Sequence, residues 1–292
     1  MQGIILRGIG GFFYAMDDQG EVHTLRAQNK LRRERMKPLV GDRVEMEPGT
    51  GEEDGWVLAV YPRKNQLVRP PVANVDKVLV VAAAASPDPD LAMIDRLLVN
   101  IRLAGIQPLL AVTKADLNPE NAREICRQYA RAGVSPVAVC APEDRGIPEL
   151  RQALQGSVHA LAGQSGAGKS SLINALYGLE LETGDLSRKI ERGKNTTRRC
   201  ELIPVSGGGM VLDTPGFSLL DTPLMEPEKL KELYPEFAPY EGKCFFSPCL
   251  HAHEPKCAAR DAVAEGEIDA RRHGRYVEFL EETKKRWKER YG

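Results

Sequence analysis

The chain has 292 residues, of which 42% are hydrophobic and 28% charged, so it can bury a sizeable core beneath an ordinary soluble surface. The longest apolar run, from Val78 to Ala85, is far shorter than the roughly 20 residues that a membrane-spanning helix needs, and the N-terminus lacks the apolar segment of a signal peptide. We therefore expect a cytoplasmic protein without a membrane partner. Forty basic against 41 acidic residues leave no overall preference for nucleic acid, so such a partner must be met by local patches.

Residues 1–69 contain five short β-like runs separated by turn signals, at 3–7, 11–15, 22–25, 43–46 and 56–61. This pattern predicts a small β-barrel, and a Gly41-Asp42 turn directly before a strand is typical of five-stranded oligonucleotide-binding (OB) barrels. The segment 30–37 carries five basic residues and one acidic residue. We expect a loop there that contacts phosphates, with a merely solvated charged loop as the alternative.

Arg69-Pro70-Pro71 predicts a stiff extended break and the start of a second domain, residues 70–221. Predicted strands at 77–84, 107–112, 136–140 and 157–161 alternate with predicted helices, which indicates an α/β domain with a mostly parallel sheet. Residues 222–292 are charged and helical in pattern, and they surround a cysteine cluster. We expect a third, helical and metal-binding domain.

A phosphate-binding loop of the form G-x-x-x-x-G-K-S spans 163–170, between a predicted strand and a predicted helix. Its backbone N–H groups are expected to surround phosphate oxygens, with Lys169 reaching the β- and γ-phosphates and Ser170 binding Mg²⁺. The predicted nucleotide-binding residues of this loop are Gly163, Gln164, Ser165, Gly166, Ala167, Gly168, Lys169, Ser170 and Ser171.

A second magnesium element is predicted at the end of a strand over 210–213, in the pattern D-T-P-G. Asp213 is expected to hold the ion through a water, and Gly216 to offer its N–H to the γ-phosphate. Between the two elements lies a basic, glycine-containing loop with two threonines, either of which could close over Mg²⁺; we favour Thr197 over Thr196.

The four residues Thr113-Lys114-Ala115-Asp116 follow a predicted strand and resemble the guanine-reading motif N/T-K-x-D of GTPases. The Asp116 carboxylate can accept two hydrogen bonds that guanine donates and adenine cannot, while the Lys114 stem covers the base plane. Cys140 and Ala141, after the next strand, occupy the place of a second base-contacting loop. An ATPase or kinase is disfavoured by Asp116 and by the absence of an evident acceptor-substrate site. The base motif precedes the phosphate loop, which is a circularly permuted order.

The spacing Cys244-x4-Cys249-x-His251-x5-Cys257 provides three thiolates and an imidazole, the set that zinc uses in closed structural sites. We expect one structural zinc ion, with His253 as an alternative nitrogen ligand and four unrelated residues as the alternative to a metal site. Because the surrounding segments are charged and offer few apolar residues to bury, zinc is expected to hold this region together.

These motifs, together with Arg69-Pro-Pro-Val-Ala-Asn-Val-Asp76, resemble the RsgA family of bacterial small-ribosomal-subunit biogenesis GTPases over essentially the whole chain. The resemblance implies that the barrel and the zinc region bind the small (30S) subunit and its 16S rRNA. It also implies that the subunit stimulates hydrolysis of GTP to GDP and phosphate during late maturation. A monomer that binds Mg²⁺ with GTP or GDP is expected.

One position departs from that family, whose switch loop commonly reads G-[RK]-H-T-T with a histidine linked to hydrolysis. Asn195 stands there, and asparagine can orient a water but cannot take up a proton near neutral pH. The catalytic candidates are therefore Asn195, Lys169 and Thr197. Phe217, after the D-x-x-G glycine, cannot orient water as the glutamine of Ras-like enzymes does, so slow intrinsic hydrolysis is expected. The alternative is a nucleotide-gated RNA-binding module with negligible hydrolysis.

Overall fold

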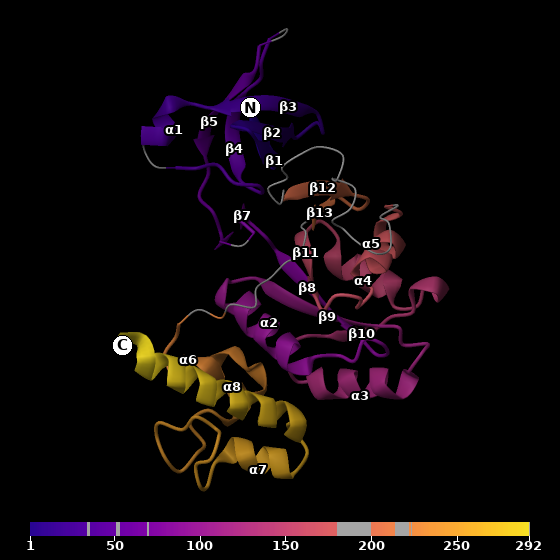
Figure 1. Cartoon of the computed structure of the whole chain (residues 1–292), viewed down its shortest axis with the longest axis vertical. Helices are drawn as coiled ribbons and strands as arrows, with labels where there is room; N and C mark the ends of the chain where they lie inside the picture. The colour runs from indigo at the N-terminus through magenta and orange to yellow at the C-terminus, as the bar shows by residue number, and fades with distance from the viewer. Residues whose placement is uncertain are drawn as a thin grey trace.

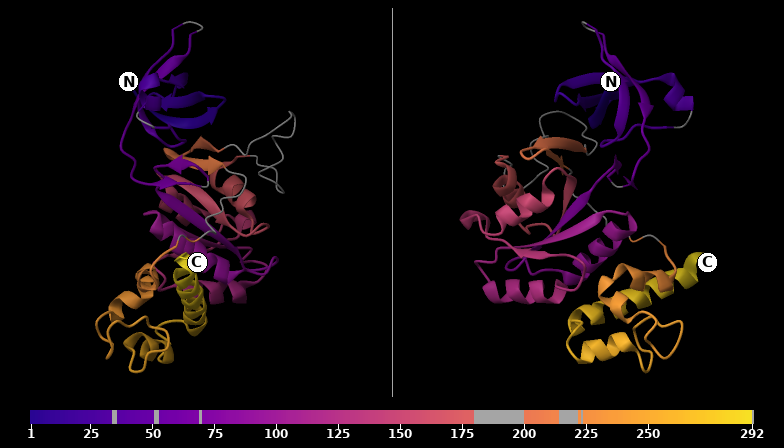
Figure 2. Two further views of the ribbon diagram at one scale, coloured as in Figure 1. Left: turned by 60° about the vertical axis from the view of Figure 1, so that its left-hand side comes forward. Right: turned by 180° about the vertical axis from the view of Figure 1, so that it is seen from behind.

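The computed structural model describes residues 1–33, 36–50, 53–68, 70–179, 200–213, 222 and 224–291. Three parts follow one another along the long axis of the molecule: a β-barrel, a sheet covered by helices, and a helical region (Figure 1). Two further views show that the helical region lies at the opposite end from the barrel (Figure 2). None of the helices in the described ranges combines the length and the apolar character that crossing a bilayer requires.

The N-terminal part is a closed five-stranded barrel of β1 (Gln2–Ile9), β2 (Phe12–Asp17), β3 (Val22–Ala27), β4 (Arg43–Glu47) and β5 (Gly55–Val60). The strand order is β1-β2-β3-β5-β4, and β4 pairs back onto β1. Alternating residues of these strands fill the interior, as a barrel requires. The buried core residues are Ile5, Ala15, Leu25, Leu31, Val44, Met46 and Val57. The predicted OB-type barrel is confirmed.

The basic segment 30–37 does not begin as the predicted loop. Helix α1 (Asn29–Arg33) occupies its start, and Leu31 is buried in the barrel core while Lys30 and Arg33 are exposed. The single leucine among basic residues explains the difference, because burying its side chain fixes one helical turn against the barrel.

The predicted extended break is wrong at Pro70 and Pro71, which lie in a turn between the antiparallel short strands β6 (Gln66–Leu67) and β7 (Val72–Ala73); Arg69 lies outside the described residues. Leu67 and Val72 are buried, so the chain turns back to cover both side chains. Gly41 lies against this pair: its φ is +85°, and a Cβ there would sit 2.1 Å from the Ala73 carbonyl oxygen. The barrel is thus packed onto the start of the next part, and the domain boundary near residue 70 stays a prediction.

The middle part is a six-stranded sheet in the order β10-β9-β8-β11-β13-β12. Its strands are β8 (Lys77–Ala83), β9 (Gln107–Thr113), β10 (Pro136–Ala138), β11 (Val158–Gly163), β12 (Glu201–Val205) and β13 (Gly209–Asp213). All neighbours are parallel except β12, which pairs antiparallel with β13. The mostly parallel sheet is confirmed. β12 was not predicted; it also pairs antiparallel with β1, with Glu201 opposite Arg7, so the strands of the barrel and of the middle part form one continuous sheet.

Helices cover both faces of this sheet. On one face, α2 (Leu91–Leu103) and α3 (Pro119–Tyr129) pack on Val78 and Val80. On the other, α4 (Ile147–Leu154) and α5 (Lys169–Tyr177) pack on Leu79 and Val81. The continuous apolar run of β8 reflects this two-sided burial. The short 3₁₀-helix η1 (Ala141–Glu143) follows β10.

The C-terminal part consists of α6 (Pro227–Leu230), η2 (Lys231–Leu233), η3 (Pro235–Tyr240), α7 (Ala258–Ala264), α8 (Ala270–Lys288) and η4 (Glu289–Tyr291). The expectation that it has few apolar residues to bury is wrong. Tyr234, Phe237 and Tyr276 form a buried aromatic cluster whose ring centroids lie 4.7–5.8 Å apart. Cys249 and Cys257 belong to the same core, so the cysteine cluster is embedded in apolar packing.

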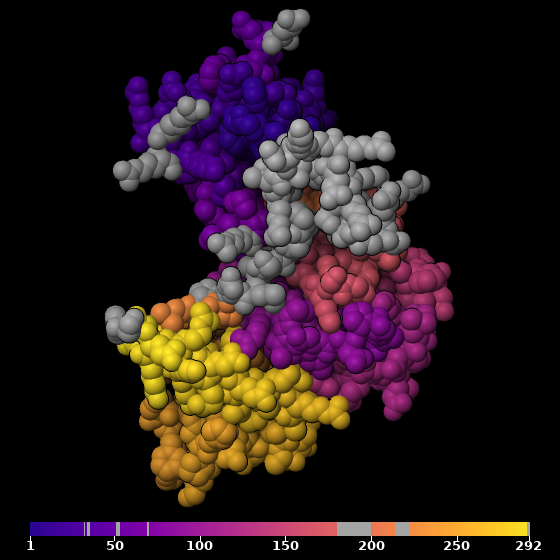
Figure 3. Space-filling view, viewed as in Figure 1, coloured from indigo at the N-terminus to yellow at the C-terminus, as the bar shows by residue number. Residues whose placement is uncertain are grey.

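A buried set of charges attaches this part to the middle sheet. The Asp95 carboxylate of α2 accepts hydrogen bonds from Arg272 and Arg275 of α8, and from the Tyr129 hydroxyl at 2.6 Å. Arg272 also donates to Glu236 at 2.5 Å. The side chains of Asp95, Glu236 and Arg272 are at most 3% exposed. In the space-filling view the C-terminal segment, in yellow and orange, lies directly against the purple and magenta surface of the middle part (Figure 3).

Candidate nucleotide-binding and metal sites

The phosphate loop lies where β11 ends at Gly163 and α5 begins at Lys169. Gly163 has a φ of +143°, and a Cβ there would sit 2.2 Å from the Val81 carbonyl oxygen, so only glycine fits. Gly168 caps α5 with a φ of +88°. The N-terminal N–H groups of α5 have no partners within the helix and can therefore bind an anion.

Lys169 is partly buried within this loop. Its ammonium donates hydrogen bonds to the carbonyl oxygens of Gly163 at 2.9 Å and of Gln164 at 2.8 Å. Burial lowers the pKa of Lys169 from its ordinary value. A charge held against the backbone of the loop is positioned for a phosphate that enters it.

The structure brings the base motif and the phosphate loop together, although about 50 residues separate them in sequence. The Thr113 hydroxyl donates to the Ala167 carbonyl at 2.6 Å, and the Lys114 ammonium donates to the Gly166 carbonyl at 3.0 Å. Lys114 adopts a left-handed φ of +56°, which ends β9. One compact edge of the sheet therefore carries both elements that a nucleotide would need.

Asp116 is exposed at this edge, and Cys140 from the end of the neighbouring strand lies beside it. Burial, together with the nearby Asp116 carboxylate, raises the pKa of the Cys140 thiol. The backbone N–H of Ala115 donates to the Val139 carbonyl at 3.2 Å, which fixes one loop on the other. An exposed carboxylate on a fixed loop is suited to accept hydrogen bonds from a base.

Asp213 ends β13, which pairs with the strand that leads into the phosphate loop. Its Oδ1 atom is buried and has no hydrogen-bond partner among the residues that the structure describes. Burial, with a contribution from the Glu201 carboxylate, raises the pKa of Asp213. A buried carboxylate oxygen without a partner is costly, so this position fits a cation or its bound water. Ser170, in the first turn of α5, offers the hydroxyl oxygen that such an ion also uses.

The switch-loop candidates Asn195, Thr196 and Thr197 lie outside the described residues, as do Gly216 and Phe217. Their roles stay predictions.

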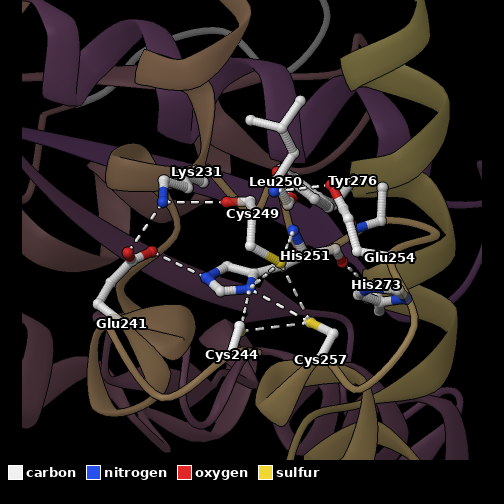
Figure 4. Close-up of polar contacts among 11 residues, drawn as sticks. Lys231, Glu241, Cys244, Cys249, Leu250, His251, Glu254, Cys257, His273 and Tyr276 are labelled. Carbon is white, nitrogen blue, oxygen red and sulfur yellow. Dashed lines mark hydrogen bonds and ion pairs between the residues drawn. The ribbon is translucent and has the colours of Figure 1, made fainter. Parts of the chain in front are cut away.

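The four predicted metal-ligating side chains converge between η3 and α7, with all ligand atoms within 4.8 Å of one another (Figure 4). The Cys257 Sγ lies 3.8 Å from the Cys244 Sγ and 3.6 Å from the Cys249 Sγ. The His251 Nδ1 lies 3.4–3.6 Å from the three sulfur atoms. His253 is exposed and is not part of this cluster. The cluster could hold a metal ion.

Two carboxylates that were not predicted from the sequence support the cluster. Glu241 Oε1 lies 2.8 Å from His251 Nε2, which directs Nδ1 of the same ring toward the sulfur atoms (Figure 4). Glu254 accepts hydrogen bonds from the backbone N–H groups of Leu250, Ala252 and His253. These amides lower its pKa despite burial. Glu254 could have been found from its place three residues after a predicted histidine ligand, whereas no such sequence signal marks Glu241.

Comparisons with known proteins agree with this geometry. The family model RsgA GTPase matches residues 60–223, and the model RsgA N-terminal domain matches residues 2–57. "Small ribosomal subunit biogenesis GTPase RsgA" of Geobacillus kaustophilus is 43% identical over 295 residues, covering 99% of each chain. The protein of the same name from Caldanaerobacter subterraneus is 40% identical over 293 residues, covering 100% of this chain and 98% of that protein.

Two solved structures share the fold over nearly their whole length. The crystal structure of YjeQ from Thermotoga maritima is 35% identical with a TM-score of 0.83, covering 97% of this chain and 98% of that one. The structure of YloQ, described as a circularly permuted GTPase, is 33% identical with a TM-score of 0.80, covering 98% of this chain and 95% of that one. Likeness of this extent, carried by a permuted set of GTPase motifs, shows that the chain belongs to the RsgA GTPase family.

Proposed function

We propose that this GTPase binds the small (30S) ribosomal subunit through its 16S rRNA and acts in late maturation of the subunit, hydrolysing GTP to GDP and phosphate when docked. The nucleotide part is supported by the contact of Thr113 and Lys114 with the loop 163–170, since the proposed base-reading and phosphate-binding residues are then neighbours. The ribosomal part is supported by the name shared by the relatives over their full length.

In this proposal each residue of the nucleotide site has one task. Asp116 accepts hydrogen bonds from the guanine N1 and N2 groups, and Cys140 and Ala141 border the base. The amides of the phosphate loop and the Lys169 ammonium bind the β- and γ-phosphates. Ser170, Asp213 and Thr197 would hold Mg²⁺, with Thr196 as the alternative threonine. The bound ion neutralises charge that develops on the phosphate oxygens.

Hydrolysis is assigned to the switch loop. Asn195 would orient the attacking water by hydrogen bonding, with Thr197 and Lys169 beside the γ-phosphate, and Gly216 would donate its N–H to that phosphate. Because asparagine cannot act as a base near neutral pH and Phe217 has no polar group, the isolated protein turns over slowly. Four basic residues of the loop, Arg192, Lys194, Arg198 and Arg199, would contact rRNA phosphates, and this contact would bring Asn195 and Thr197 over the γ-phosphate.

The metal proposed for the C-terminal cluster is zinc. A tetrahedral zinc ion with Zn–S bonds of about 2.3 Å and a Zn–N bond of about 2.05 Å separates sulfurs by about 3.8 Å and sulfur from nitrogen by about 3.6 Å. The separations from the Cys257 sulfur to the other two sulfurs, 3.6 and 3.8 Å, and from the His251 Nδ1 to the three sulfurs, 3.4–3.6 Å, support this assignment. Four protein ligands leave no open position, so the zinc would be structural.

The proposal places subunit contacts at both ends of the molecule. At the barrel end, exposed Lys30 and Arg33 of α1 supply positive charge for phosphates. The protein would act as a cytoplasmic monomer.

The test is phosphate release from saturating GTP by the purified chain, with and without purified small subunits at low salt. We expect stimulation of at least about tenfold, equivalent to roughly 1.4 kcal/mol off the barrier. Asn195→Ala should reduce the stimulated rate and leave nucleotide affinity nearly unchanged. Equal turnover with and without subunits would instead favour a nucleotide-gated RNA-binding module with negligible hydrolysis.

A further inference from the structure

Two adjacent aromatic side chains stand exposed on the segment that supplies the metal ligands. Phe245 is 69% and Phe246 47% exposed, and among residues 224–290 of the described part only Leu224, at 49%, is a further large hydrophobic residue this exposed. Their ring centroids lie 4.9 Å apart at an interplanar angle of 77°. Single exposed apolar residues are ordinary, but a paired, edge-to-face arrangement presents a defined aromatic surface.

The metal ligands on either side fix this pair. Phe245 directly follows Cys244, and its backbone N–H donates to the carbonyl of Lys256 at 3.1 Å, one residue before Cys257. The Lys256 ammonium lies 4.6 Å from the centroid of the Phe245 ring, in a cation–π contact. A backbone hydrogen bond and a cation–π contact therefore hold the Phe245 ring in place, which lowers the entropy lost when a partner binds.

The charges of the same segment favour an anionic partner. Glu241 contacts Lys231 and His251, although its side chain is still 45% exposed, and the Glu254 carboxylate accepts from three backbone N–H groups, so both acids have partners (Figure 4). Lys243 and Lys256 are exposed, and neither forms an ion pair with any residue that the structure describes. The surface left outside combines aromatic rings with positive charge.

We propose that Phe245, Phe246, Lys243 and Lys256 form a platform on which an unpaired RNA base stacks, with the two lysines on the adjacent phosphates. Bases stack on exposed aromatic rings whatever their sequence, and lysines follow the backbone. Two rings flanked by lysines are too small an apolar surface for a hydrophobic protein interface. The proposal rests on the proposed function, because it names where the C-terminal region contacts subunit RNA.

The test compares two double variants of the full-length protein. Phe245→Leu with Phe246→Leu keeps apolar volume but removes the rings, whereas Phe245→Tyr with Phe246→Tyr keeps the rings. We expect the leucine pair to bind purified small subunits at least about tenfold more weakly than wild type, and the tyrosine pair to bind like wild type. Metal content and GDP affinity should be unchanged in both variants.

A second arm uses a single-stranded RNA oligonucleotide with a 2-aminopurine base, whose fluorescence falls when the base stacks. We expect quenching by the wild type and the tyrosine pair and none by the leucine pair. Wild-type binding by the leucine pair, or equal loss by both pairs with metal retained, would overturn the platform. If the wild-type protein does not bind small subunits, the proposed function is wrong, and the oligonucleotide experiment still tests whether the platform binds an RNA base.

Discussion

The proposed nucleotide site and the proposed metal site of this molecule are built in opposite ways. The nucleotide site uses backbone groups and short side chains at the ends of β9, β11 and β13, strands fixed by two apolar layers. The metal site uses side chains from an irregular segment between η3 and α7, and two of its ligands are themselves core residues. We therefore expect the strands of the nucleotide site to stay folded without nucleotide, whereas the C-terminal part should depend on its metal for folding.

The largest effect is expected where the ligand and the fold coincide. Cys249→Ser, or treatment with a chelator, removes a buried ligand and should release the metal and expose residues 224–288 to protease, because metal-binding free energy is folding free energy in such sites. Elemental analysis and limited proteolysis check this. Cys126→Ser, in α3 of the middle part, is the matched control and should keep the metal. Purified wild-type protein without metal would contradict the account.

A smaller loss is expected at the buried charges between the two parts. Arg272→Ala leaves the Asp95 and Glu236 carboxylates without their shared partner, which costs about 3–5 kcal/mol for a buried pair. Arg271→Ala, next in sequence, removes an arginine whose side chain is 70% exposed and should cost under about 1 kcal/mol. Equilibrium denaturation by urea measures both, and equal costs for the two variants would show that this attachment is not what stabilises the C-terminal part.

At the nucleotide site we expect function to change without the fold. Asp116→Asn replaces a carboxylate acceptor by an amide, which should weaken GTP binding by about 100-fold, roughly 2.7 kcal/mol, and shift preference toward XTP. Because Asp116 is exposed, the free energy of unfolding should change by less than about 0.5 kcal/mol. Titration with both nucleotides decides the matter, and an unchanged GTP affinity would refute the base assignment.

The smallest effect is expected at the contact between barrel and sheet edge. Arg7 and Glu201 form a 3.2 Å ion pair whose side chains are 41% and 43% exposed, so Arg7→Ala should cost no more than about 1 kcal/mol. Arg63→Ala should cost more, because Arg63 binds Asp42, whose side chain is fully buried. Thermal unfolding of the two variants measures both losses of stability. A larger loss for Arg7→Ala than for Arg63→Ala would contradict this ranking of the two ion pairs.

The sequence also predicts the surroundings of the nucleotide site better than those of the metal site. Regular strand and helix spacing located the phosphate loop, the base motif and Asp213, because parallel strands bring their carboxyl ends to one edge. The aromatic core could not be predicted, since Tyr234 lies between two short 3₁₀-helices, Phe237 in η3 and Tyr276 in α8, without a shared periodicity.

Tertiary contacts explain the other differences. Burial of Leu31 in the barrel core stabilises α1 at the start of the basic segment. Burial of Leu67 and Val72 stabilises the β6–β7 pair where a linker was predicted. Neither depends on local preference, so neither could be read from neighbouring residues. Glu241 was likewise recognisable only once its carboxylate was seen beside His251.

The most direct test of this contrast is hydrogen exchange of the full-length, GDP-saturated protein before and after metal removal, read by mass spectrometry. We predict that peptides from 224–288 lose protection, while peptides of β8, β9 and β11 and the GDP affinity stay unchanged. Loss of protection in those strands in step with the C-terminal peptides, or loss of GDP affinity, would contradict it, because the nucleotide site would then depend on the metal as well.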